Sequence, residues 1–202
     1  MITLQHYFDH PPVLIPFADY QFPWEVTSAL KELLENCIAQ LGDAFMIRDG
    51  IAIHKSATIE KNVTFKRPVV IMEKAYVAAN TYFREGVFLD TSSKIGPGCE
   101  VKCSVIGTHS ALAHFNYVGN SLIGAHVNFE AGSIAANHYN ERDSKEIHVH
   151  FNNTMMVTGV SKFGALVGDH CKIGANAVLS PGTVLAKNKI IRRLELVEQI
   201  KL

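Results

Sequence analysis

With 202 residues, the chain is long enough for one domain with a substantial core and an additional segment. Its 19 lysines and arginines balance its 19 aspartates and glutamates, which argues against a nucleic-acid or polybasic membrane surface but permits a local anion pocket. The four cysteines form no CxxC pair, which favours free thiols in a reducing compartment. Because we find neither a signal-peptide pattern nor an apolar run of membrane-spanning length, we expect a cytoplasmic protein that binds neither nucleic acid nor membrane.

The first 46 residues predict an extended segment followed by a helix. Residues 1–23 are rich in proline and aromatic side chains, and the apolar residues then fall on one helical face: Leu30, Leu33, Leu34, Cys37, Ile38 and Leu41. Pro23 suits the first turn of this helix, and Gly42 suits the position after its end. Because the end of a solenoid needs a cover, we interpret the helix as a cap over the first coil of the repeat described next. A helix that binds a partner is the alternative.

Residues 47–187 carry a six-residue repeat. A large apolar residue occupies every sixth position, in the series Ile53, Ile59, Phe65, Ile71, Val77, Phe83, Leu89, Ile95 and Val101. This period is typical of the hexapeptide β-helix, in which three hexads make one triangular coil and the coils stack about 4.8 Å apart. After a slip the ladder continues as Ile106, Leu112, Val118, Ile123, Phe129 and Ala135, and it resumes as Val167, Ile173, Leu179 and Leu185. We therefore predict an all-β fold, a left-handed parallel β-helix of hexapeptide repeats with an N-terminal helical cap.

Two segments depart from the repeat. Residues 137–159 begin polar and then alternate, and Asn152-Asn153 suits a tight turn, which predicts a loop and a β-hairpin that project from the prism. Long insertions in solenoids usually lie on the working face. Residues 188–202 are interpreted as a C-terminal tail, with a helical spacing in Ile191, Leu194 and Val197.

Polar residues near the middle of the repeat are candidates for chemistry. His114 follows a core position by two residues and is therefore expected near a corner, where an imidazole has a suitable pKa for a general base. By spacing alone, a solvated corner histidine is the favoured interpretation. Asn128 lies 14 residues later, on the neighbouring coil near the same edge. Arg84 and Lys102 are 18 residues, one coil, apart, so they are expected to stack and bind a phosphate unless Arg84 only pairs with a carboxylate such as Glu100.

A metal site was weighed against these candidates. His109 and His114 have a spacing that resembles the zinc ligands of the γ-class carbonic anhydrases. That family needs a third histidine about two coils earlier, and residues 73–81 contain none. His148 and His150 share a strand face, which is weak evidence for a metal. We therefore expect no metal in the site, and a zinc-dependent hydratase is the least favoured function.

A set of motifs spread over residues 50–187 carries a more specific signal. The set consists of Glu100-Val101-Lys102, His114-Phe115-Asn116-Tyr117-Val118-Gly119-Asn120-Ser121-Leu122-Ile123-Gly124, Val127-Asn128, Ala131-Gly132-Ser133-Ile134 and Asn137. It resembles the acetyltransferase half of bifunctional N-acetylglucosamine-1-phosphate uridyltransferase/glucosamine-1-phosphate acetyltransferase. The later run Lys162-Phe163-Gly164-Ala165-Leu166-Val167-Gly168-Asp169 is similar to archaeal-type sugar-1-phosphate nucleotidylyltransferases.

The resemblance implies an acetyl-CoA-dependent N-acetyltransferase that acts on an amino-sugar phosphate such as glucosamine 1-phosphate. It also implies a homotrimer with each site between neighbouring subunits. His114 falls on the family's catalytic histidine. The substrate-binding residues implied are Arg84, Lys102, Tyr117 and Asn128, and the implied contacts with acetyl-CoA are Asn137, Ala131 and Gly164.

Some positions depart from the family pattern. The nucleotidyltransferase half is absent from this sequence, so we do not expect nucleotidyl transfer. Glu130 stands where the family has a small glycine, beside the expected path of the coenzyme. A further substrate lysine has no aligned counterpart, with Arg142 or Lys145 as substitutes, and residues 192–193, both arginines, are candidates for the nucleotide end of the coenzyme. The alternative is therefore a catalytically silent trimeric scaffold or sugar-nucleotide-binding protein.

Overall fold

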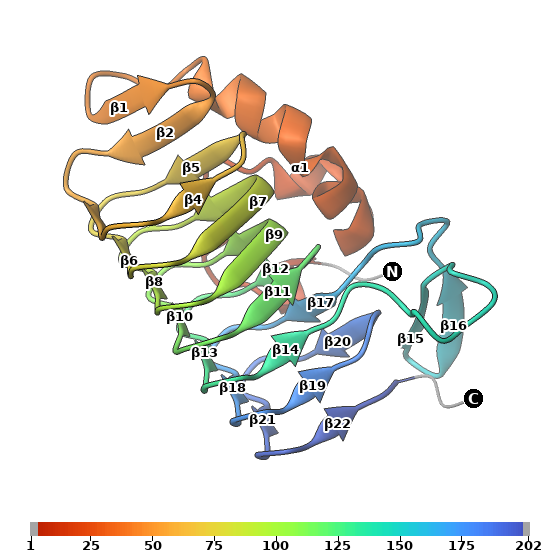
Figure 1. Ribbon diagram of the computed structural model, residues 1–202. Helices are drawn as coiled ribbons and strands as arrows, with labels where there is room; N and C mark the ends of the chain where they lie inside the picture. The colour runs from red at the N-terminus through yellow and green to blue at the C-terminus, as the bar shows by residue number, and fades with distance from the viewer. Residues whose placement is uncertain (1–3, 200–202) are drawn as a thin grey trace.

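The computed structural model describes residues 4–199, and a parallel β-helix forms its body (Figure 1). Within these residues, strands from successive coils pair in parallel and make three walls around one core. The predicted β-helix of stacked coils is confirmed. We refer to the walls as A, B and C, in the order in which the chain passes through them after β2, and to the edges between them as A/B, B/C and C/A.

Each wall is defined by its strands. Wall A consists of β3 (Thr58–Ile59), β6 (Tyr76–Val77), β8 (Lys94–Ile95), β10 (Ala111–Leu112), β13 (Asn128–Phe129), β18 (Lys172–Ile173) and β21 (Ile190–Ile191). Wall B consists of β4 (Thr64–Phe65), the first halves of β7 (Tyr82–Leu89) and β9 (Glu100–Ile106), β11 (Tyr117–Gly119), β14 (Ile134–Ala135), β19 (Val178–Leu179) and β22 (Leu196–Val197). Wall C consists of β2 (Ile51–His54), β5 (Val69–Ile71), the second halves of β7 and β9, β12 (Leu122–Ile123), β17 (Ala165–Val167) and β20 (Thr183–Leu185). A further strand, β1 (Phe45–Arg48), pairs antiparallel with β2.

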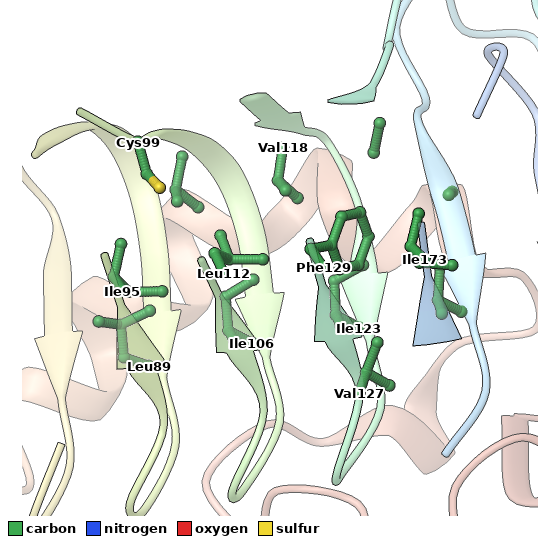
Figure 2. Packing of buried hydrophobic residues seen from close by; sticks show 14 of the residues in the cluster. Leu89, Ile95, Cys99, Ile106, Leu112, Val118, Ile123, Val127, Phe129 and Ile173 are labelled. Carbon is green, nitrogen blue, oxygen red and sulfur yellow. The ribbon is translucent and has the colours of Figure 1, made fainter. Parts of the chain in front are cut away.

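Inward side chains of neighbouring coils stack into columns, as the six-residue ladder predicts. Leu112 of wall A pairs with Ile95 above it and with Phe129 below it, and all of them are buried. Wall C contributes a parallel column through Ile106 and Ile123. Figure 2 shows these side chains pointing into the space between the walls. Burial of such columns is the main favourable term in the folding of a solenoid.

The slip in the ladder has its cause at the B/C edge. The coil of β7 turns this edge with Glu85 and Gly86, whereas the next two coils turn it with one residue each, Cys103 and then Asn120. Both single residues have a left-handed backbone, with φ of 43° and 46°. A coil that turns with one residue fewer is one residue shorter, so the ladder advances by five positions instead of six at that edge.

Wall C is apolar on its outer face as well as its inner face. The buried outward side chains form a column of Ala52, Val70, Phe88, Val105, Leu122, Leu166 and Val184. Helix α1 (Pro23–Ile38) contacts β5, β7 and β9, and its Val26, Leu30 and Leu34 belong to the same buried cluster. The helix therefore forms as predicted, but it runs alongside the coils instead of capping the first one (Figure 1). The apolar outer column gives it a larger surface to bury than the end of the prism does.

The N-terminal segment completes this cover. It contains two short 3-10 helices, η1 (Leu4–His6) and η2 (Phe17–Asp19), and it buries Leu4, Tyr7, Phe8, Ile15 and Phe17 in the cluster on wall C. Walls A and B carry no such cover within residues 4–199. No helix in that range combines the length and the apolar character needed to cross a bilayer.

An insertion separates β14 from β17. It contains β15 (His148–Phe151) and β16 (Thr154–Val157), an antiparallel hairpin that turns at two asparagines with positive φ, Asn152 and Asn153. Its base packs on the lower part of wall C through Ile147 and Val149. After β20, the strands β21 and β22 continue walls A and B, so residues 188–199 belong to the β-helix. This differs from the expected tail, because Ile191 and Val197 continue the six-residue spacing.

Candidate active site

Two stacked cations lie on the outer face of wall B beside the B/C edge. Arg84 of β7 and Lys102 of β9 are register partners on neighbouring coils, as their spacing predicts. Arg84 Nη1 donates to Glu100 Oε1 at 2.8 Å, and this hydrogen bond raises the pKa of the Arg84 guanidinium. Both side chains remain partly exposed, by 39% for Arg84 and 33% for Glu100, so the pair is accessible from solvent. The Glu100 carboxylate neutralises the charge of Arg84. Within residues 4–199, no carboxylate forms an ion pair with Lys102.

A third cation reaches this edge from the far side of the insertion. The pKa of Lys102 is lowered by burial first, and then by the positive charges of Lys162 and Arg84. Lys162 immediately precedes Phe163, whose backbone N–H donates to the Asn137 carbonyl at 3.2 Å and so returns the chain to the edge. The positive charges of Lys162 and Arg84 near Lys102 repel its ammonium group. A bound anion would offset this repulsion and stabilise the site.

A notch lies next to Lys102 on the following coil, where Gly119 is its register partner. A Cβ placed on Gly119 would lie 2.5 Å from Tyr117 Oη and 2.7 Å from Asn137 Nδ2, so only glycine leaves room for these two groups. Tyr117 Oη donates to Asn137 Oδ1 at 3.1 Å, and Asn137 Nδ2 donates to Asn120 Oδ1 at 2.6 Å. Burial raises the pKa of the Tyr117 hydroxyl, which keeps it protonated as the donor in this chain.

Gly164 lies directly below the notch. Its N–H donates to the Asn120 carbonyl at 2.9 Å, and a Cβ there would clash with the Gly119 carbonyl oxygen. The B/C edge thus brings together five of the residues singled out from the sequence: Arg84, Lys102, Tyr117, Asn137 and Gly164. It adds two residues to which sequence reasoning gave no role, Lys162 and Asn120. Both residues lie within the motifs that carry the resemblance, and Asn120 is also one shortened coil of 17 residues before Asn137, a spacing that could have indicated their contact.

The remaining predicted residues lie at the A/B edge and on wall A. His114 is exposed at the A/B edge, and its carbonyl accepts the Gly132 N–H at 2.8 Å. Ala131 lies at the same edge one coil below, and Asn128 is exposed on wall A in β13. Strand β11 separates His114 from the B/C edge, so within one chain the structure does not bring the histidine together with the cations. The neighbouring Phe115 is 73% exposed, which is unusual for a phenylalanine.

The Glu130 carboxylate, near the A/B edge, is hydrogen-bonded to residues farther along the β-helix. Its carboxylate accepts two hydrogen bonds from the Arg193 guanidinium, at 2.9 and 3.1 Å, and one from the Ala175 N–H at 2.9 Å. The hydrogen bonds from Arg193 hold the pKa of Glu130 below its usual range. Glu130 and Arg193 border a groove of about 670 Å³ on wall A, whose lining also includes Lys172 and Arg192. The groove is cationic and continues downward from Asn128.

Arg142 and Lys145, the substitutes considered for the family's unaligned substrate lysine, form contacts within the insertion. The Arg142 guanidinium lies 3.4 Å from the centre of the Tyr139 ring, and Lys145 Nζ donates to the Asn140 carbonyl at 2.7 Å. The charge of Lys162, in contrast, acts on Lys102 at the B/C edge.

His109, one of the histidines considered for a metal site, stacks with His126 and His170 along the C/A edge. The rings of His109 and His126 lie 5.1 Å apart, and those of His126 and His170 lie 4.9 Å apart and nearly parallel. Across residues 4–199, no group of three His, Cys, Asp or Glu side chains is arranged to hold a metal ion.

Comparisons with known proteins find curated relatives that align along most of this chain. It is 32% identical over 183 residues to a bifunctional sugar-1-phosphate nucleotidylyltransferase/acetyltransferase of Sulfurisphaera tokodaii, a match that covers 86% of this chain and 45% of that protein. It is 30% identical over 187 residues to the bifunctional protein GlmU of Methanococcus vannielii, covering 84% of this chain and 41% of that protein. The chain thus spans less than half the length of these curated relatives. No protein-family model matches it.

Among solved structures, the acetyltransferase domain of PglB from Neisseria gonorrhoeae in complex with acetyl coenzyme A covers 84% of this chain and 64% of its own, with 16% identity and a TM-score of 0.46. The sequence relatives carry the assignment, because they align along most of this chain. The chain is a homologue of the acetyltransferase part of the bifunctional sugar-1-phosphate nucleotidylyltransferase/acetyltransferases, as its motifs predicted.

Proposed function

We propose that the chain is an acetyl-CoA-dependent N-acetyltransferase whose acceptor is an amino-sugar phosphate of the glucosamine 1-phosphate type. The observation that carries the proposal is the cluster of Arg84, Lys102 and Lys162 beside the Gly119 notch. Among residues 4–199, Glu100 is the one carboxylate in an ion pair with these cations, and the nearby Glu85 carboxylate is paired with Lys31. A phosphate monoester supplies the missing negative charge and accepts hydrogen bonds from all of them.

The sugar would lie over wall B, with its phosphate at the B/C edge. The half-buried Tyr117 and the exposed Asn128 offer hydrogen bonds to sugar hydroxyls. His114 accepts a proton from the 2-amine of the sugar while the amine nitrogen attacks the thioester carbonyl of acetyl-CoA. A new C–N bond forms, the C–S bond breaks, and the thiol of coenzyme A leaves with a proton. Asn137 Nδ2 has a second N–H, besides the one donated to Asn120, that can stabilise the developing oxyanion.

The coenzyme would follow the A/B edge. Ala131 and the coils below it lead to the cationic groove on wall A, where Lys172 and Arg192 can hold phosphates. The Glu130 carboxylate borders this groove, and its hydrogen bonds with Arg193 offset its negative charge.

The placement of these groups supports an oligomer with its sites between copies, which we propose to be a homotrimer. His114 and the cations lie at opposite edges of wall B, so a second copy is needed to complete the site. Wall C is covered by α1 and the N-terminal segment, which leaves walls A and B for contacts between copies. The exposed Phe115 and Leu194, the latter 78% exposed, provide apolar side chains at the A/B edge for such a contact.

A thiol-release assay with acetyl-CoA and glucosamine 1-phosphate tests the function. We expect release that depends on the sugar, and we expect His114→Ala to lower the rate by roughly 10²–10⁴-fold, because proton transfer by a positioned base contributes about that much. His109→Ala, which changes a histidine at the C/A edge outside the groove on wall A, is the matched control and is expected to keep the wild-type rate. An equal rate in wild type and His114→Ala would contradict the mechanism. Absence of release, with a melting temperature raised by either ligand, would favour a binding protein without turnover.

A further inference from the structure

We propose that Asn120 is a positioning residue that fixes the side-chain amide of Asn137 for acyl transfer; this inference rests on the function proposed above. The two side chains are both buried, each with 8% exposure, and they are joined by the hydrogen bond of 2.6 Å from Asn137 Nδ2 to Asn120 Oδ1. Asn120 itself lies behind the notch and reaches the substrate side only through Asn137. Its role is therefore to orient another group, without contact with the reacting atoms.

With the Asn120 side chain in its present orientation, the two partners of Asn137 favour one orientation of its amide. The Tyr117 hydroxyl donates to Oδ1, and Asn120 Oδ1 accepts from Nδ2. A rotation of the amide by half a turn would place Asn137 Oδ1 against Asn120 Oδ1 at hydrogen-bond distance, where two acceptors repel each other. In a buried setting the loss of such a hydrogen bond leaves polar groups unsatisfied, which is costly. The acceptor on Asn120 thus keeps the N–H groups of Asn137 directed away from Tyr117.

Two backbone hydrogen bonds fix the position of Asn120. Its N–H donates to the Lys102 carbonyl at 2.8 Å, and its carbonyl accepts the Gly164 N–H at 2.9 Å, so the residue is fixed between the coils above and below. It turns the B/C edge alone with φ of 46°. Asparagine tolerates this left-handed conformation better than most residues with a side chain, and glycine adopts it without strain.

The side-chain amide of Asn137 lies beside the proposed phosphate site. Asn137 Nδ2 borders the Gly119 notch, directly below Lys102, where the proposed phosphate-binding cations begin. A donor fixed before the substrate arrives stabilises a developing oxyanion without reorganisation, whereas a donor free to rotate loses part of this effect.

Two substitutions separate the side chain from the backbone. Asn120→Gly removes the side-chain acceptor, and glycine adopts the left-handed backbone of this corner. Asn120→Asp has a side chain of the same shape, whose carboxylate oxygens accept hydrogen bonds and do not donate them. We expect Asn120→Gly to lower kcat by roughly 10–100-fold with KM for glucosamine 1-phosphate within about threefold, since one preorganised donor is worth about 10²–10³-fold when lost entirely. We expect Asn120→Asp to keep kcat within about threefold and to raise KM, because it adds a negative charge beside Lys102. Ser110→Ala removes a buried side chain that bridges coils at the C/A edge and controls for general loosening.

A readout independent of turnover accompanies the kinetics. In protein labelled with ¹⁵N-asparagine, the side-chain NH₂ signals of Asn137, assigned by their loss in Asn137→Asp, are expected to shift in Asn120→Gly and to stay in place in Ser110→Ala. Wild-type kcat in Asn120→Gly, or unshifted Asn137 signals, would overturn the inference. A wild-type protein without thiol release would overturn the proposed function and the catalytic part of this inference together. The shift of the Asn137 signals would then still show that the contact exists.

Discussion

Lys162 stands close enough to Lys102 to lower its pKa, although 60 residues separate the two in the sequence. The stacking of Arg84 and Lys102 was predictable, because one coil of the repeat separates them and a regular coil returns to the same place. Lys162 follows an insertion of irregular length, so no multiple of the repeat connects it to the other cations. Asn120 differs in this respect, because it lies 17 residues before Asn137, the length of one shortened coil, so their contact was predictable once the slip in the ladder was taken into account.

Substitution of Lys162 tests the cation cluster at this scale. We expect Lys162→Met to raise the Kd for glucosamine 1-phosphate roughly tenfold to hundredfold, because it removes a charge-assisted hydrogen bond to the phosphate. Calorimetric titration measures the change. Lys145→Met, which removes a lysine that donates to the Asn140 carbonyl within the insertion, is the matched control. Equal affinities in the two variants would place the phosphate elsewhere.

At the scale of elements, the six-residue ladder predicted the coils and their inward columns, because only the inward position of each hexad must be large and apolar. It did not predict where α1 packs. The outward column on wall C was present in the sequence as runs such as Val69-Val70-Ile71 and Val87-Phe88-Leu89, in which the middle residue points outward. A run of three apolar residues in a repeat that needs only one indicates a wall that is covered on both sides.

Trp24 connects this cover to the site. Its ring packs edge-on against Phe163 with centroids 5.8 Å apart, and Phe163 lies between Lys162 and Gly164. Farther along the same helix, Lys31 pairs with Glu85, the residue after Arg84. Helix α1 therefore braces the B/C edge at both ends of the cation cluster.

Phe88 tests the packing of α1 against wall C. It points out of the prism, yet it is only 1% exposed. We expect Phe88→Ala to lower the free energy of unfolding by about 3–5 kcal/mol, the usual range for a buried phenylalanine. Lys94→Ala, at an exposed outward position on wall A of the same coil, is expected to change it by less than about 0.5 kcal/mol. Denaturant unfolding of both variants measures the difference, and an equally small effect for Phe88 would mean that α1 does not cover this wall.

For the whole molecule, the division of the site between two edges of wall B is the central feature. The sequence motifs pointed to the residues on both edges, but they did not show that a single chain separates them, because residues in one motif can face different directions around a corner. His114 and Tyr117 are three residues apart, yet one lies at the A/B edge and the other extends toward the notch at the B/C edge. The account therefore requires that one copy supply the histidine and another supply the cations.

Complementation between two inactive variants tests this requirement most directly. His114→Ala and Lys102→Met would be co-expressed with different tags, and mixed oligomers would be isolated through both tags and assayed for thiol release. If each site takes its histidine from one copy and its lysine from the next, every mixed trimer contains one intact site of its three, so the isolated mixed oligomers recover roughly one third of the wild-type sites. Each variant assayed alone gives the background. Activity of the mixed oligomers no higher than that background would show that both residues act within one chain and would contradict the account.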